Sequence, residues 1–156
     1  WRLLVKRIPL NKEVLVSRLE EIRQDLEELK SFQGISFEEY DKGYNFAISE
    51  HYLRRALEAI FDIGSHILSR IPGARPTTYK EVAVLLGRYE IVPNNFVEEK
   101  LVKIAGYRNR LIHFYHEIKE KELYQIIQNN MDDIGKFCSY IKEVVENPGK
   151  FRLEVR

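Results

Sequence analysis

The stretch from Tyr107 to Tyr115 holds the side chains of this chain that are best suited to chemistry. It places Arg108, Asn109, His113 and Tyr115 in the pattern R-N-x3-H-x-Y. A histidine with an unperturbed pKa of about 6.5 can give and take protons near neutrality. An arginine can hold a phosphate and stabilise the charge that develops on it. Together Arg108 and His113 would suffice for RNA cleavage by attack of the 2′-hydroxyl on the adjacent phosphate, which requires no metal.

Spacing alone does not separate this interpretation from a structural one, because an arginine and a histidine near a helix end are more often structural or merely exposed. The positions around them form one helical stripe, three or four residues apart: Val97, Leu101, Ile104, Arg108, Leu111 and Tyr115. Five of these six are apolar or aromatic, and Arg108 is the exception. Burying an unpaired guanidinium is costly, so we expect Arg108 to face an interface, a partner charge or a wet cleft.

A second polar cluster is formed by Glu58, Asp62 and His66, which follow one another at intervals of four residues. On a helix they neighbour one another on one face. They could orient a catalytic group or bind a cation, and the alternative is a polar seam between two helices. Two carboxylates and one histidine fall short of a metal site. We therefore expect neither a metal nor a cofactor.

The elements that must position these groups are helices. Apolar periodicity predicts helices over about residues 11–30, 37–70, 78–87, 94–116 and 121–146. Asn11 is the expected N-cap of the first, Ser36 and Thr78 open capping boxes, and Asn94 or Asn95 caps the motif helix. The acidic face of the first helix, which includes Asp25, is interpreted as solvated. We predict an all-α antiparallel bundle of four main helices plus a short helix.

Composition bounds the remaining possibilities. The chain has 156 residues, a formal net charge of +1 and one cysteine, Cys138. This length fits a single domain over residues 1–156, with a core at about 11–146 and short terminal extensions. The small net charge gives no overall case for nucleic-acid binding, so any such case depends on local patches. No apolar run reaches membrane-spanning length, so we expect a cytoplasmic protein without membrane contact.

Three features of the sequence together resemble the HEPN superfamily, and within it the HepT-type toxins. The first is the motif from Arg108 to Tyr115. The second is the segment Asp62 to Ile67, which reads D-I-G-S-H-I. The third is the order of what lies between them, namely Pro76, Tyr79, Leu85, Leu86 and Ile91. The likeness covers about residues 11–145, and the motif with its upstream segment is fairly specific.

This resemblance implies a homodimer in which two motif helices meet at a cleft where RNA is cut without a metal. Arg108 would position the phosphate, His113 would be the acid–base residue, and Asn109 would order the site. The Glu58, Asp62 and His66 cluster would support it. The implied partner is a minimal nucleotidyltransferase antitoxin that transfers AMP from ATP to Tyr115, which would add phosphate charge and bulk beside the catalytic pair.

Two other functions stay open from the sequence. One is a non-catalytic subunit that binds a nucleotide or substrate for a nucleotidyltransferase. The other is a helical dimer scaffold in which Arg108 and His113 only pair across the interface.

Overall fold

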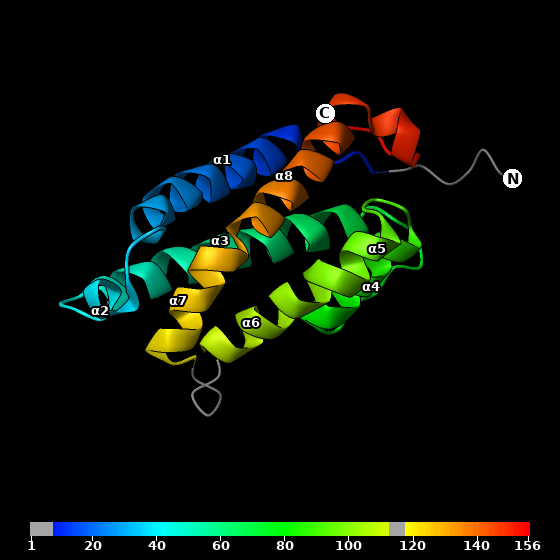
Figure 1. The fold of residues 1–156 in the computed structure, drawn as a ribbon. Coiled ribbons are helices and arrows are strands. Elements are labelled where there is room, and N and C mark those ends of the chain that lie inside the picture. Colours follow the sequence, from blue (N-terminus) through cyan, green and yellow to red (C-terminus); the bar gives the residue numbers. More distant parts are fainter. Residues whose placement is uncertain (1–7, 113–117) are drawn as a thin grey trace, which may run out of the picture.

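The computed structural model describes residues 8–112 and 118–156 and shows a bundle of α-helices (Figure 1). The predicted all-α fold is confirmed. The helices are α1 (Lys12–Leu29), α2 (Phe37–Tyr40), α3 (Asn45–Leu68), α4 (Tyr79–Arg88), α5 (Asn94–Phe96), α6 (Val102–Ile112), α7 (Glu120–Asn129) and α8 (Met131–Glu146). Short 3-10 turns lie at Lys30–Phe32 and Pro148–Phe151, and a π-helical turn joins α5 to α6 over Val97–Leu101. No helix within the described ranges is long and apolar enough to cross a membrane.

Helices α1 and α3 pack against each other more extensively than any other pair of described helices. The α1 stripe packs as predicted, because Leu15, Ile22 and Leu29 are fully buried. Asn11 caps the helix, its side chain accepting a hydrogen bond from the Val14 amide at 3.1 Å. The start and the buried face of α1 therefore follow directly from its sequence.

The single helix expected over residues 37–70 is wrong, because the chain breaks between α2 and α3. Ser36 does cap α2, accepting from the Glu39 amide at 3.1 Å. Gly43 then adopts a φ of +60°, a conformation that ends a helix and favours glycine. The hydroxyls of Tyr40 and Ser49 lie 2.6 Å apart and tie the two helices together. The apolar period over residues 37–70 predicts Tyr44 and Ile48 on the buried face of this helix, but they are 81% and 45% exposed.

The helix expected over residues 121–146 is likewise two helices, which meet at Asn130. The backbone of Asn130 has φ −118° and ψ 2°, outside the helical region. Its side-chain amide donates to Asp133 at 3.2 Å, a local hydrogen bond that competes with helical structure. The apolar period continues through the break, since Ile127 and Ile134 are both buried. This continuity is why the periodicity alone predicted one helix.

The motif helix is preceded by a close helix crossing. Thr78 caps α4 by accepting from the Glu81 amide at 3.1 Å, as predicted. The expected cap at Asn94 or Asn95 is wrong, because Pro93 is the N-cap of α5 and no side chain caps it. The Asn94 side chain instead lies where a Cβ on Gly87 would project, so it packs against the end of α4. The chain then continues through the π turn into α6.

The two terminal segments meet beside the end of α8 (Figure 1). An isolated parallel bridge joins Leu10 to Val155. The Leu10 amide donates to the Glu154 carbonyl at 2.7 Å, and the Arg156 amide donates to the Leu10 carbonyl at 2.9 Å. Residues 8–10 and 152–156 thus form part of the fold, and Leu10 is buried.

Candidate active site

The Arg108 side chain lies on an aromatic ring rather than against a carboxylate. Its guanidinium carbon is 3.9 Å from the centroid of the Tyr79 ring, at the first residue of α4. Tyr79 in turn packs edge-on against Phe61 of α3, with ring centroids 5.2 Å apart. A cation over an aromatic face is attracted by the ring's negative charge density, by about 0.5–2 kcal/mol. The stack therefore joins α3, α4 and α6 at Arg108.

The guanidinium of Arg108 has an unused donor. Its Nε is buried and has no hydrogen-bond partner among residues 8–112 and 118–156. Leaving a buried donor of this kind unpaired is unfavourable, and a negatively charged acceptor would relieve the cost. A phosphate oxygen is such an acceptor, and the guanidinium fork fits it well. The local geometry is therefore suited to holding an oxyanion.

Of the other three residues singled out in the motif, the structure describes Asn109 only. Asn109 is half-buried on α6 and makes no hydrogen bond to another described residue. His113 and Tyr115 lie outside the described residues. The described part of the motif is therefore its arginine end, Arg108 to Ile112.

Arg110 links the two helices that flank residues 113–117. Its guanidinium makes a bidentate ion pair with Glu122 at the start of α7, with Nη2 to Oε2 at 2.7 Å. The second contact joins Nη1 and Oε1 of the same pair. The nearby phenol of Tyr107 has its pKa raised by burial and then by the charge of Glu122. The pair fixes the ends of α6 and α7 relative to each other.

The second polar cluster faces α1. Asp62 makes an ion pair with Arg18 at 3.6 Å, and His66 Nε2 accepts from the Asn11 amide at 3.0 Å. Burial, and then the charge of Arg70, lowers the pKa of His66. Glu58 is half-buried. No hydrogen bond or ion pair among the described residues joins this cluster to Arg108.

The sequence analysis did not predict that the carboxylate of Asp25 is buried. Asp25 was expected on a solvated face, but it is 0% exposed and lies 3.3 Å from the Arg55 guanidinium. Burial raises the pKa of Asp25 to about 6, against the opposing effect of Arg55. The available signal was its position three residues after Ile22 and four before Leu29, on the buried stripe.

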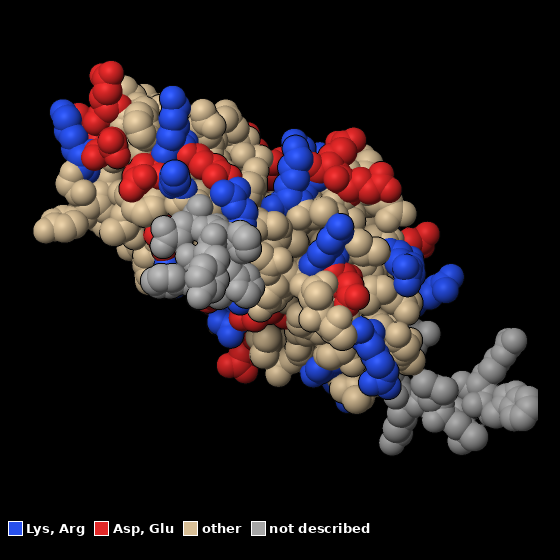
Figure 2. Space-filling view, turned by 90° about the horizontal axis from the view of Figure 1, so that it is seen from below, with Lys and Arg blue, Asp and Glu red and all other residues tan. Residues whose placement is uncertain are grey.

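Two further arginines, on α3, are paired with carboxylates. Arg54 makes an ion pair with Glu50, and Arg55 pairs with Glu21 and Asp25. On the face seen in Figure 2, basic and acidic side chains are interspersed. Within the described parts of the chain, no three His, Cys, Asp or Glu side chains are grouped so that they could hold a metal ion.

Solved structures define the class of this fold. A tri-AMPylated Shewanella oneidensis HEPN toxin, solved in complex with MNT antitoxin, aligns with a TM-score of 0.73 and 20% identity. That alignment covers 83% of this chain and 96% of the toxin. YutE from Bacillus subtilis, a cytosolic protein of unknown function, aligns with a TM-score of 0.69 over 85% of this chain and 91% of its own. The fold is thus that of the HEPN helical proteins.

Sequence comparison then defines the family. Residues 22–141 match the family described as Ribonuclease HepT-like. The tRNA nuclease HepT of Aphanizomenon flos-aquae is 31% identical over 115 residues, covering 73% of this chain and 78% of that protein. The mRNA nuclease HepT of Shewanella oneidensis is 27% identical over 90 residues, covering 58% and 67%. This chain belongs to the HepT-like ribonuclease family, as the motif and its flanking segments predicted.

Proposed function

We propose that this protein is a metal-independent endoribonuclease and the toxin of a HEPN/MNT-type toxin–antitoxin pair. The observation that carries the proposal is Arg108, at the start of an intact R-N-x3-H-x-Y motif. Its guanidinium is fixed on Tyr79, and its buried Nε has no hydrogen-bond partner in the part of the chain that the structure describes. Family membership supports the ribonuclease activity, and the named relatives act on RNA.

In the proposed reaction Arg108 holds the scissile phosphate and His113 moves protons. The RNA 2′-hydroxyl loses its proton to a base and attacks the adjacent phosphorus, while the 5′-oxygen leaves and receives a proton. The products are a 2′,3′-cyclic phosphate and a 5′-hydroxyl. Asn109 orders the site by hydrogen bonding. Two copies of α6 would meet at the cleft of a homodimer, which supplies a place for a half-buried arginine on an apolar stripe.

Neutralisation would occur at Tyr115. A minimal nucleotidyltransferase would transfer AMP from ATP to the tyrosine hydroxyl and release pyrophosphate. The added phosphate and nucleoside would repel RNA and fill the cleft beside Arg108. The Shewanella oneidensis relative that shares this fold is tri-AMPylated and was solved with MNT antitoxin, which supports the same partnership here.

The test is cleavage of total cellular RNA by unmodified protein in excess EDTA. We expect the wild type to produce 2′,3′-cyclic phosphate ends, and His113→Ala to be inactive. Arg108→Gln should lower kcat by about 10²–10³-fold, which is typical for loss of one donor to a developing oxyanion. Lys136→Gln, an exposed position on α8, is the control for charge and should match the wild type.

The outcomes separate the proposed enzyme from the open alternatives. If wild type and His113→Ala both leave RNA intact, and intact mass shows no AMP on Tyr115, the enzyme proposal fails. Binding of a nucleotide by that inactive protein would then support the non-catalytic subunit. A loss of thermal stability in both variants without any activity to lose would support the scaffold.

A further inference from the structure

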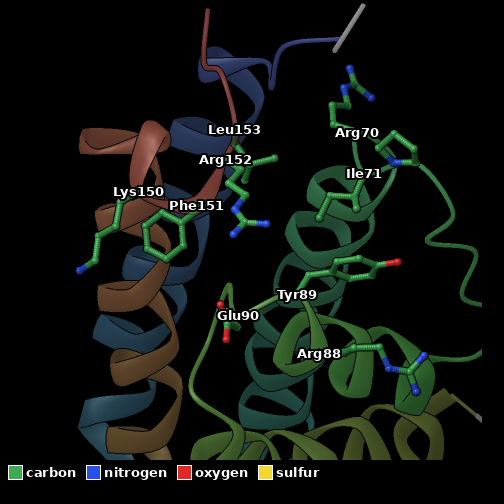
Figure 3. Close-up of a pocket in the computed structure, with 10 residues that line it drawn as sticks. Arg70, Ile71, Arg88, Tyr89, Glu90, Lys150, Phe151, Arg152 and Leu153 are labelled. Carbon is green, nitrogen blue, oxygen red and sulfur yellow. The ribbon is translucent and has the colours of Figure 1, made fainter. Parts of the chain in front are cut away.

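A hollow lies at the end of the bundle where the terminal segments meet. Its volume is about 580 Å³, and it opens between the C-terminal ends of α3 and α4 and the segment that follows α8 (Figure 3). In that view Arg152 reaches into the hollow, with Phe151 and Glu90 on one side and Ile71 and Tyr89 on the other. We call this hollow the terminal pocket. Its size is that of an ordinary small-ligand site.

The terminal pocket is strongly basic for so neutral a chain. Arg70, Arg88, Lys150 and Arg152 line it together with a single carboxylate, Glu90. These five side chains carry a net charge of +3, whereas the whole chain carries +1. The helix dipole favours a cation at a helix C-terminus, which accounts for Arg70 after α3 and Arg88 at the end of α4. The dipole of an α-helix does not account for Lys150, which lies in the 3-10 turn, or for Arg152, which follows that turn.

Three of these cations, Lys150, Arg70 and Arg88, differ in how far they are committed to partners among the described residues. Lys150 pairs with Glu143 at 3.2 Å, and its side chain is 68% exposed. Arg70 bonds the Pro9 carbonyl and the Ser69 hydroxyl, which are both neutral acceptors. Arg88 has no hydrogen bond or ion pair within the described parts of the chain. Figure 3 shows the side chains of Arg70, Arg88 and Lys150 directed outward, so they place their positive charge at the rim of the pocket.

Two backbone conformations direct side chains at this pocket. Glu90 has φ +60° and Arg152 has φ +58°, and they are the non-glycine residues with positive φ among residues 8–112 and 118–156. Both residues lie where a helix ends, since Glu90 follows the C-cap of α4 and Arg152 is the C-cap of the 3-10 turn, and a left-handed residue is common at that position. Both residues line the terminal pocket, so the ends of α4 and of the 3-10 turn form part of its wall.

We propose that the terminal pocket binds single-stranded RNA, holding backbone phosphates on its arginines and a base against Tyr89 or Phe151. Cations combined with aromatic rings are the usual means of binding a single strand, because every base has a face that stacks. The choice of RNA as the ligand rests on the proposed function. The pocket would be a second contact for the RNA that the candidate active site cleaves.

The terminal pocket is distinct from the candidate active site. Tyr79, under Arg108, begins α4, and Arg88 ends it. A ten-residue helix separates its first and last residues by about 14 Å. Lys150 to Leu153 also lie beyond residues 22–141, the part of the chain that matches the family. The pocket is therefore built partly from a segment additional to the matched region.

The first test measures binding without cleavage. His113→Ala protein is titrated into a fluorescently labelled single-stranded 12-mer RNA at 0.1 M salt, and anisotropy is followed. Adding Arg152→Gln, or Arg88→Gln with Lys150→Gln, should weaken binding by about fivefold for each phosphate contact removed, and should flatten the salt dependence. Lys30→Gln with Lys42→Gln removes two charges at the opposite end of the molecule and should change neither.

Two results of this titration would contradict RNA binding at the terminal pocket. Unchanged RNA affinity in the Arg88 and Lys150 double variant and in Arg152→Gln sinks the proposal, as does an equal loss in the Lys30 and Lys42 control. Circular dichroism and melting establish that each variant is folded, and the double variant alters side chains without buried contacts. If AMP binding is lost in these variants while RNA binding is kept, the ligand is a free nucleotide and the RNA proposal is wrong.

The second test separates this proposal from the proposed function. On the His113-intact protein, the pocket variants should lower kcat/KM for a 20-mer RNA and leave it unchanged for a dinucleotide, which cannot reach both sites. An equal loss on both substrates contradicts a second contact. If the wild type cleaves neither substrate, the proposed function fails, and the anisotropy result alone decides whether the terminal pocket binds RNA.

Discussion

At the scale of single residues, the Arg108 guanidinium is positioned by its contact with the aromatic ring of Tyr79. The guanidinium is held by Tyr79, and Tyr79 is held by Phe61, so the position of the charge depends on two aromatic contacts. Tyr79 does not belong to the R-N-x3-H-x-Y motif. We infer that it is a positioning residue for Arg108.

This role predicts a difference between two substitutions of Tyr79. Tyr79→Phe keeps the aromatic face and should retain near wild-type kcat/KM for RNA. Tyr79→Leu removes the face, frees the guanidinium, and should lower kcat/KM by about tenfold, in line with the strength of a cation–π contact. The readout is RNA cleavage at matched thermal stability. Equal activity of the Phe and Leu variants would contradict the positioning role.

Asp25 gives a pH-dependent prediction. Burial raises its pKa in the folded protein from about 3.8 to about 6, so the folded state holds the proton more tightly than the unfolded state. Its contribution to stability is therefore greatest at low pH and is lost as the pH rises from about 4 to about 6. Asp25→Asn removes this titration. Relative to the wild type, the variant should gain about 2 kcal/mol in free energy of unfolding between pH 4 and pH 7.

Urea denaturation of both proteins at pH 4 and pH 7 measures that difference. Glu13→Gln, at an exposed position of the same helix, is the matched control and should show little change between the two pH values. A constant difference between Asp25→Asn and the wild type at both pH values would show that burial does not hold the proton on Asp25.

At the scale of elements, the close crossing of α3 and α4 sets the position of Tyr79. Gly64 lies at that crossing, and a Cβ added there would be 2.7 Å from Val82 Cγ1 and 3.1 Å from Leu86 Cδ1. Only the absence of a side chain lets the two helices approach so closely. The glycine within the D-I-G-S-H-I segment therefore has a packing role.

We predict that Gly64→Ala destabilises the fold by about 1–3 kcal/mol, the usual cost of overpacking a close contact. Gly135→Ala, in an α8 position with no atom within 4 Å of the added Cβ, should instead stabilise by about 0.5–1 kcal/mol. Thermal or urea unfolding compares the two. A neutral Gly64→Ala would mean that Val82 and Leu86 can move aside without loss.

Most element types could be predicted from the sequence, and the breaks could not. Asn11, Ser36 and Thr78 carry cap signals that act within three residues, so local sequence predicts them. At Gly43 the chain turns through a left-handed glycine, and the apolar residue Tyr44 that follows is exposed. At Asn130 the apolar period continues on both sides, so periodicity reports the buried face and misses the break in the backbone. The paired Asn129 and Asn130 were the available signal.

At the scale of the whole molecule, the sequence predicts the functional residues at one end of the bundle and not those at the other. The motif end was predicted, because Arg108 and its neighbours form a contiguous pattern of residues. The terminal pocket was not, because its cations come from segments about 80 residues apart along the chain, including Arg70 and Arg152. Such a group exists only in the folded chain, where the segment after α8 lies beside the ends of α3 and α4, at the end of the bundle that the bridge from Leu10 to Val155 closes.

That bridge has a consequence for how the protein is handled. Because Arg156 bonds to Leu10 beside the terminal pocket, an affinity tag fused after Arg156 would emerge next to the four cations. A polyhistidine tag there would add charge at acidic pH and bulk at any pH. RNA affinities measured on such a fusion would describe the tag as well as the protein, and the tag should be removed by protease before binding is measured.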